Sequence, residues 1–167
     1  MKDIDTIQRQ LDRVLGFFPR VERRINALFG VNTLILIIAT LNVSAGDFRL
    51  WYVAIPGSLF LVGLLVSYYH LFRANFPDDH GGENSLIFFK EIQKRTEANY
   101  IAGFIECSEA EFRNDLLGQV WRNSCIVCEK YQGVKLAILS TAISIAPFVV
   151  FLVVTSTLHA RIPLLHG

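Results

Sequence analysis

Residues 136–158 read LAILSTAISIAPFVVFLVVTSTL, and no position in this stretch carries a charged side chain. An α-helix rises about 1.5 Å per residue, so a run of about 20 apolar residues is long enough to cross the hydrocarbon core of a bilayer. The stretch therefore predicts a transmembrane helix over residues 136–158.

Two further stretches, residues 25–45 and 50–72, also lack charged side chains. The second has aromatic residues at both ends, where rings with a polar edge favour the membrane interface (Trp51, Tyr52, Tyr68 and Tyr69). The alternative is three buried helices of a soluble protein. A chain of 167 residues with 52% hydrophobic residues has too little polar helix to cover them. The sequence predicts an all-α membrane protein with three transmembrane helices.

The basic residues that flank these stretches predict the orientation. Six of them lie at the ends that share one side of the membrane: Arg20, Arg23, Arg24, Arg73, Lys130 and Lys135. The opposite side has only Arg49 and Arg161. Basic residues favour the cytosolic side. We therefore expect residues 1–24 and 73–133 in the cytosol, and a four-residue connection (46–49) and the tail 159–167 on the opposite side of the membrane.

Apolar residues in the N-terminal segment recur at alternating spacings of three and four and continue into the first span (Ile4, Ile7, Leu11, Val14, Phe18, Val21, Ile25 and Leu28). This heptad pattern predicts an amphipathic helix over residues 1–24 that packs on a partner helix. The partner is another cytosolic helix or a second subunit, and the alternative is an anchor on the membrane surface. Pro19 predicts a kink or the start of a new helix.

Residues 73–133 predict a small cytosolic helical bundle. Asn84 or Ser85 is placed to cap a first helix that contains Leu86, Phe88, Phe89 and Ile92, and Thr96 is placed to cap a second. The segment from Ser108 to Glu111 matches a capping box, in which each residue bonds the backbone of the other. No proline follows before Pro147, so we expect one long helix from about Glu109 into the third span. A change in the bundle would then shift a transmembrane helix.

Catalytic and metal chemistry have weak support. Asp78, Asp79, His80 and Glu83 have the side chains of metal ligands, but a solvated turn explains them better because no second cluster lies elsewhere in the segment. Cys125 and Cys128 have the spacing of a redox or zinc pair, but without further ligands they fit two buried, apolar-like cysteines. Since no Ser/His/Asp set and no phosphate-binding glycine loop occurs, we expect no catalytic residue, no metal, no cofactor and no enzyme activity.

One face of the expected long helix carries side chains that could bind a nucleotide. Asp115, Gln119, Asn123 and Lys130 share this face, and Lys94, Arg95, Tyr100 and Arg122 are near in sequence. Amides can pair with a base edge, a cation with a phosphate, and an aromatic ring with a base. The candidate ligand-binding residues are Tyr100, Gln119, Arg122, Asn123 and Lys130. The alternative is a solvated face. Since residues 73–133 hold seven basic and ten acidic residues, any anion site must be local.

Polar residues also occur inside the first and third spans: Asn32, Thr33, Thr40, Asn42 and Ser44, and Ser140, Thr141 and Ser144. Such residues commonly hold transmembrane helices together. Alternatively, they could line a wet path between several subunits. Both interpretations predict a homo-oligomer.

The sequence also resembles a known family. The residues that carry the resemblance are NSLIFFKEI (84–92), Tyr100, DLLGQVWRNSCIVCEKY (115–131) and the stretch from Arg20 to Leu36. Together with the spacing of the expected helices over residues 20–158, they resemble the Pycsar effector membrane proteins of bacterial antiphage defence. The N-terminal segment before Arg20 lies outside this resemblance.

The resemblance implies a non-enzymatic effector that responds to a cyclic pyrimidine mononucleotide, cCMP or cUMP, made by a partner cyclase after infection. It further implies impairment of the inner membrane that stops growth before the phage matures, which is abortive infection. It supplies no ligand-binding motif, so the candidate residues rest on their chemistry alone. Two alternatives remain: a membrane effector driven by a cyclic oligonucleotide, and a constitutive membrane scaffold without a small ligand.

Overall fold

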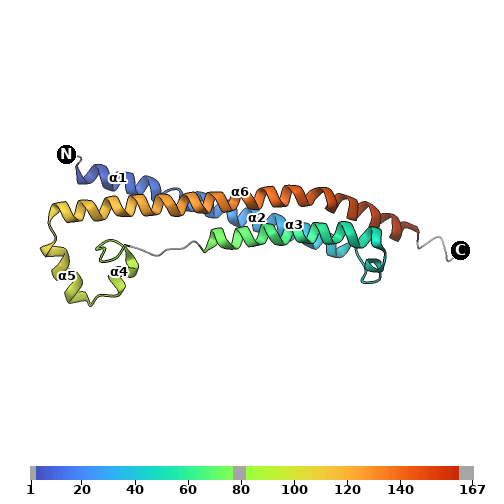
Figure 1. Cartoon of the computed structure of the whole chain (residues 1–167), viewed down its shortest axis with the longest axis horizontal. Coiled ribbons are helices and arrows are strands. Elements are labelled where there is room, and N and C mark those ends of the chain that lie inside the picture. The colour runs from blue at the N-terminus through green and yellow to red at the C-terminus, as the bar shows by residue number, and fades with distance from the viewer. Residues whose placement is uncertain (1–2, 77–81, 162–167) are drawn as a thin grey trace. The chain divides into compact units, whose positions relative to one another are not determined.

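The computed structural model describes residues 3–76 and 82–161, with side chains as far as residue 159 (Figure 1). Helices make up 86% of the structure, and the described residues contain no strand, which confirms the all-α prediction. In chain order the elements are α1 (Ile4–Leu15), α2 (Phe18–Leu41), the 3-10 turn η1 (Asp47–Arg49), α3 (Trp51–Asn75), α4 (Phe89–Gln93), α5 (Glu97–Glu106) and α6 (Glu109–Arg161).

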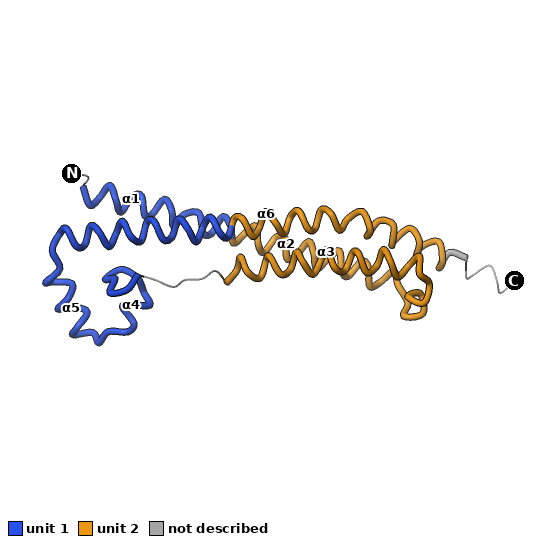
Figure 2. The backbone as a smooth tube through the Cα atoms, viewed as in Figure 1, with its two compact units in different colours: residues 1–21, 77–130 blue, residues 22–76, 131–167 orange. Residues whose placement is uncertain are grey.

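The helices form two compact units (Figure 2). Unit 1 comprises Met1–Val21 and Pro77–Lys130, and unit 2 comprises Glu22–Phe76 and Tyr131–Gly167. The long helix α6 is continuous and contributes residues to both units, as the sequence predicted.

Three helical stretches of the described chain are long and apolar enough to cross a membrane: Ile4–Leu41, Trp51–Asn75 and Glu109–His159. Only 17%, 28% and 22% of the residues in their most apolar windows are buried by the protein itself. Most of this apolar surface is therefore left to a surrounding solvent, and lipid is the solvent in which it is stable.

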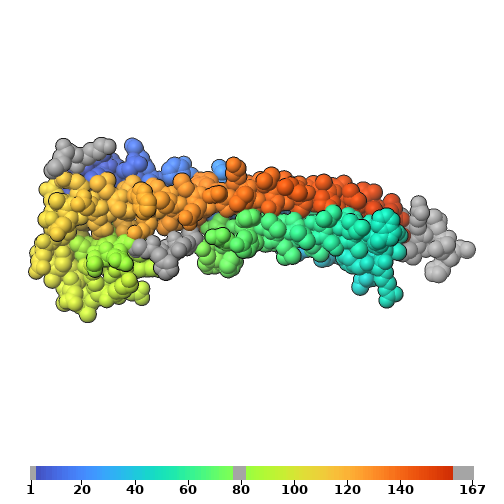
Figure 3. Space-filling model, in the orientation of Figure 1, coloured from blue at the N-terminus to red at the C-terminus, as the bar shows by residue number. Residues whose placement is uncertain are grey.

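The helices α3 and α6 lie side by side in unit 2 (Figure 3), and small residues between them let them pack closely. A Cβ atom added to Gly63 would lie 2.7 Å from the Cβ of Ser144, and one added to Gly133 would lie 2.8 Å from the Cβ of Ala74. Both distances are too short for real carbon contacts, so larger residues would push the two helices apart. Small residues at the interface are typical of helix pairs in membranes.

The connection between α2 and α3 is longer than the predicted four residues and occupies residues 42–50. Its turn is held by Asp47, whose Oδ2 accepts the backbone N–H of Ser44 at 2.7 Å and lies 3.3 Å from Nε2 of His159. Such side-chain to backbone bonds compete with helix formation. The helix α2 therefore ends at Leu41, and residues 42–45 of the predicted span belong to the connection.

The N-terminal heptad pattern packs within the chain. In unit 1, Ile7 and Leu11 of α1 are buried against Leu116 of α6. The partner of α1 in the structure is therefore α6, another helix of the same chain. Pro19 is the second residue of α2, where its missing N–H costs little, so it starts a new helix rather than kinking an old one.

The predicted helix caps of α5 and α6 are confirmed. Thr96 Oγ1 accepts the N–H of Asn99 at 3.3 Å. The Ser108 hydroxyl accepts the N–H of Glu111 at 3.3 Å, and the Glu111 carboxylate accepts the N–H of Ser108 at 2.8 Å. Hydrogen bonds from the Ser108 hydroxyl and backbone hold the pKa of Glu111 below its usual value.

The helix predicted to begin at Asn84 or Ser85 is shorter than expected. α4 begins only at Phe89, so Leu86 and Phe88 lie in the preceding segment. Ser85 Oγ accepts the N–H groups of Ile87 and Phe88, and Leu86 donates its N–H to Asp115. These bonds satisfy backbone groups outside a helix, so the segment stays a turn.

Candidate functional site

Three polar side chains form a closed set of hydrogen bonds inside unit 2. Asn32 Nδ2 donates to Ser67 Oγ at 2.9 Å, and Thr141 Oγ1 donates to Asn32 Oδ1 at 2.9 Å. Ser67 Oγ lies 2.8 Å from Thr141 Oγ1 and 3.0 Å from the carbonyl of Ala137. Because Thr141 donates its only proton to Asn32, the single hydroxyl proton of Ser67 is shared between the carbonyl of Ala137 and Thr141 Oγ1. All three residues are buried, and each comes from a different helix.

We call Asn32, Ser67 and Thr141 the polar ring. Asn32 and Thr141 were predicted to pack membrane helices, and the structure joins them within one chain, both directly and through Ser67. The remaining polar residues of the predicted spans bond mostly to their own helices. Thr40 donates to Ile37, Asn42 to Ile38, Ser140 to Leu136 and Ser144 to Thr141. Thr33 bonds to its own helix at Phe29 and lies 3.0 Å from the Tyr68 hydroxyl of α3.

In unit 1, three of the five candidate ligand-binding residues contact the segment 82–88. Tyr100 donates its hydroxyl to the carbonyl of Leu86 at 3.3 Å, and Gln119 donates to Ser85 Oγ at 3.1 Å. The Arg122 guanidinium lies over the Phe88 ring, 5.5 Å from its centroid. These residues position the segment.

Arg122 is packed tightly. Its Nη1 is buried and has no hydrogen-bond partner among the residues that the structure describes. It also lies against Gly82, where a φ of +78° already favours glycine and an added Cβ would collide with the guanidinium.

The other two candidates lie elsewhere on α6. Asn123 Nδ2 donates to the carbonyl of Gln119 in its own helix at 2.8 Å. Lys130 is only 5% exposed, and its Nζ lies 5.9 Å from the centroid of the Phe18 ring. The five candidates thus do not surround one cavity, although their role in binding remains a prediction.

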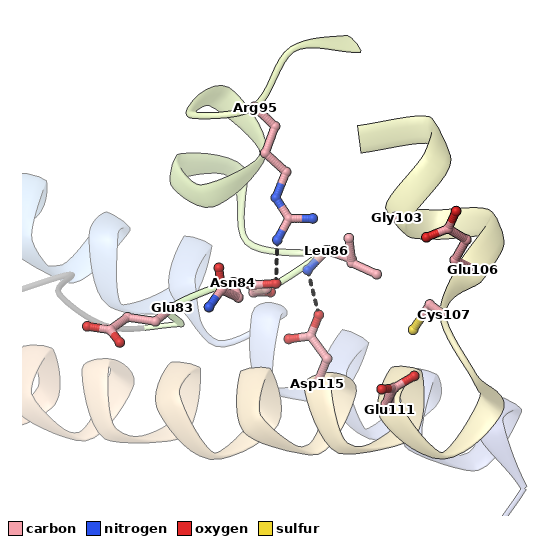
Figure 4. A pocket seen from close by; sticks show the side chains of 10 residues that line it. Glu83, Asn84, Leu86, Arg95, Gly103, Glu106, Cys107, Glu111 and Asp115 are labelled. Carbon is pink, nitrogen blue, oxygen red and sulfur yellow. Dashed lines mark hydrogen bonds between the residues drawn. The ribbon is translucent and has the colours of Figure 1, made fainter. Parts of the chain in front are cut away.

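Unit 1 has a cavity of about 540 Å³, which is lined in part by the segment 83–86 (Figure 4). We call it the unit 1 cavity. Its walls come from that segment, Arg95, the end of α5 and the start of α6, and its lining residues are Glu83, Asn84, Ser85, Leu86, Arg95, Gly103, Glu106, Cys107, Glu111 and Asp115. None of the five candidates is among them.

Two of the lining charges are half-buried, and hydrogen bonds fix both (Figure 4). Arg95 Nη2 donates to the carbonyl of Asn84 at 2.7 Å, and Asp115 Oδ2 accepts the N–H of Leu86 at 2.7 Å. The carboxylates of Glu83, Glu106 and Glu111 are exposed. The inner cavity therefore offers one guanidinium and one carboxylate, and its rim offers further acceptors.

Sequence reasoning noted Arg95 and Asp115 but did not choose them, and it missed Ser67. Asp115 lies on the same helix face as Gln119, and this spacing was the sequence feature that could have identified it as a site residue. Ser67 is a lone hydroxyl in an apolar run, and nothing in its surroundings in the sequence marks it.

The cysteines and Glu83 form no metal-binding group with other described residues. Cys125 is half-buried and Cys128 is exposed, so the expectation of two buried cysteines is wrong for Cys128, which faces outward from α6. No group of three or more metal-ligating side chains occurs in the described residues. Of the acidic turn, Glu83 is exposed, and Asp78, Asp79 and His80 lie outside the described residues.

Comparison with known protein families gives a match over most of the chain. A family model described as the Pycsar effector protein domain matches residues 6–157. The match begins within α1, so the N-terminal helix belongs to the matched region, contrary to the expectation from the sequence. No curated protein and no solved structure matches the chain.

Proposed function

The chain belongs to the Pycsar effector protein family, whose members act in antiphage defence, and from this premise we propose that it is a ligand-gated effector of the inner membrane. A cyclic pyrimidine mononucleotide, cCMP or cUMP, binds unit 1 in the cytosol. Binding changes the packing of the transmembrane helices of unit 2, and the membrane loses its integrity. The protein itself catalyses no reaction, and its response ends in abortive infection.

The observation that carries this proposal is the sharing of α6 by both units. Unit 1 has a cavity within the size range of small-molecule sites, and unit 2 has the apolar helices. A ligand shifts an equilibrium only by its difference in affinity for the two states. A ligand that prefers one arrangement of the first part of α6 therefore biases the membrane part of the same helix.

Assembly of several copies is part of the proposal. The polar ring satisfies its members within one chain, so it leaves little polar surface inside a single bundle for an ion path. A path through the membrane therefore needs several chains, or a bundle that has opened. The expected assembly is a homo-oligomer in the bilayer, supplied with ligand by a partner cyclase that need not touch it.

The test is dye release from proteoliposomes that contain the purified full chain. We expect cCMP or cUMP to release the dye, and cAMP, cGMP and a cyclic dinucleotide to leave it inside. Release by the cyclic dinucleotide alone would identify an oligonucleotide-driven effector instead. An equal response to every nucleotide, or to none, would support a constitutive scaffold and refute the proposal.

A further inference from the structure

Arg95 is the one cationic side chain among the residues that line the unit 1 cavity. Arg95 is half-buried, and the described residues give its guanidinium one hydrogen bond, from Nη2 to the carbonyl of Asn84. A guanidinium has five N–H donors, so most remain available to a ligand. Its Nη1 lies 3.4 Å from the position of a Cβ on Gly103, so the absence of a side chain there keeps the approach open. Arginine pairs well with phosphate oxygens.

The rest of the polar lining consists mainly of hydrogen-bond acceptors. One carboxylate oxygen of Asp115 accepts the N–H of Leu86, and the other accepts no hydrogen bond from the described residues. Glu106 and Glu83 add carboxylates at the rim. The cavity thus matches a ligand with a single anionic group and several N–H or O–H donors. A nucleoside cyclic monophosphate has this pattern, because its ribose hydroxyl donates and its one phosphate is negative.

The acceptors also distinguish between the two pyrimidines. Cytosine carries an amino group at C4, which donates to a carboxylate, whereas the base atom at that position in uracil is a carbonyl oxygen. A carboxylate and a carbonyl oxygen repel each other, and neither supplies a proton. A cavity in which Asp115 meets the C4 substituent itself, and not the neighbouring N3–H that uracil can donate, therefore favours cytosine.

We propose that the unit 1 cavity is the nucleotide site, that Arg95 binds the phosphate, and that Asp115 accepts the amino group of cytosine, so that cCMP binds more tightly than cUMP. This inference rests on the proposed function and specifies its ligand. Tyr100 and Gln119 then act as positioning residues, since they bond to Leu86 and Ser85 in the wall of the cavity.

The test measures the binding of cCMP, cUMP and cAMP to the full chain in detergent by calorimetry. We expect cCMP to bind at least tenfold more tightly than cUMP, which is within the range for one base contact. Arg95→Gln weakens both pyrimidine nucleotides at least tenfold. Lys94→Gln is the matched control, because Lys94 is the exposed neighbour and does not line the cavity, and it leaves both affinities within twofold.

Asp115→Asn tests the base contact by exchanging one acceptor for a donor. The carboxamide oxygen can still accept the N–H of Leu86, while its amino group faces the base. We expect the preference for cCMP over cUMP to fall at least tenfold. Gly103→Leu provides a second variant that leaves the charges intact. Its side chain fills the cavity and abolishes binding of both nucleotides, while circular dichroism shows unchanged helix content.

The possible results separate this inference from the proposed function. Equal affinity for cCMP and cUMP, unchanged by Asp115→Asn, would overturn the base contact. Tight cCMP binding that survives both Arg95→Gln and Gly103→Leu would overturn the site and leave the proposed function standing. If cAMP binds as tightly as cCMP, the selection of a pyrimidine is overturned. Binding of no cyclic mononucleotide, with no dye release, would overturn the proposed function itself.

Discussion

Asn32, Ser67 and Thr141 show how much a few polar atoms matter in an apolar bundle. Each is buried, and each lies within hydrogen-bond distance of the other two. In a membrane such bonds contribute modestly, about 0.6 kcal/mol on average and up to about 1.7 kcal/mol. Their larger effect is on geometry, since only one register of the three helices brings the three side chains together.

Thr141→Val should lower the stability of unit 2 by about 1 kcal/mol, because valine keeps the shape and removes the hydroxyl that serves both Asn32 and Ser67. The measurement is unfolding in mixed detergent micelles, followed by circular dichroism. Thr40→Val is the control, because Thr40 is exposed and bonds only to its own helix. If the two variants lose equal stability, the ring makes no specific contribution.

Ser108→Ala should raise the pKa of Glu111 toward its usual value, because it removes the hydroxyl bond that chiefly lowers this pKa and leaves the backbone bond in place. Because the pKa of Glu111 is lower in the folded state, the capping box stabilises α6 at pH values above the unfolded pKa. That stabilisation disappears as the pH falls through the folded pKa. Carbon NMR titration of the Glu111 carboxyl group measures this pKa in the unaltered protein and in the Ser108→Ala variant. An unchanged titration midpoint would contradict the assignment.

At the residue level, local patterns were predictable and long-range ones were not. The capping box joins residues three apart, so the spacing of Ser108 and Glu111 was enough to predict it. The contact of Asp115 with the N–H of Leu86 joins residues 29 apart. No local spacing encodes it, and the same holds for Ser67 and Asn32.

Among the elements, the transmembrane helices were predictable because length and the absence of charge are sufficient to define them. Their ends were harder to place. α2 ends at Leu41 because Asp47 and Ser44 form a turn that competes with the helix. The start of α4 was also misplaced, since the bonds that hold Ser85 and Leu86 outside a helix come partly from α6.

Gly63→Val should weaken the packing of α3 on α6 by a few kcal/mol, because its Cβ would lie 2.7 Å from that of Ser144. Gly30→Ala is the matched control, since no atom lies within 4 Å of its added Cβ. Alanine there should be neutral or stabilise α2 by up to about 1 kcal/mol, because it is the better helix former. Thermal unfolding in detergent compares the two variants. Equal stability would show that α3 and α6 can separate without cost.

For the whole molecule, the orientation proposed from the basic residues can be tested with thiol labelling. In a variant with Cys107, Cys125 and Cys128 replaced by serine, Ala45→Cys places one exposed thiol in the connection between α2 and α3. A membrane-impermeant maleimide should label it in intact spheroplasts. As a control, a variant that retains only Cys128 should react only after permeabilisation. The reverse pattern would invert the topology.

The continuity of α6 makes a second prediction at this scale. Glu129 and Gln132 are exposed positions of α6 on either side of the boundary between the units. Replacing both with glycine disfavours the helix by about 1 kcal/mol at each position relative to alanine. We expect the double glycine variant to bind cCMP normally and to release dye at least fivefold more slowly. The double alanine variant should behave like the unaltered protein. Unchanged release with glycine would show that the signal does not travel through α6.

The polar ring has a consequence for the resting state of the proposed effector. Sliding or turning one of the three helices by a fraction of a residue breaks its contacts with both neighbours, and the apolar surroundings offer no substitute partners. The loss therefore comes in one step rather than gradually. A bundle with this property stays closed during small thermal motions and opens only when ligand binding supplies enough free energy. Under the proposed function, a host can therefore carry many copies of the protein without a gradual increase in membrane permeability.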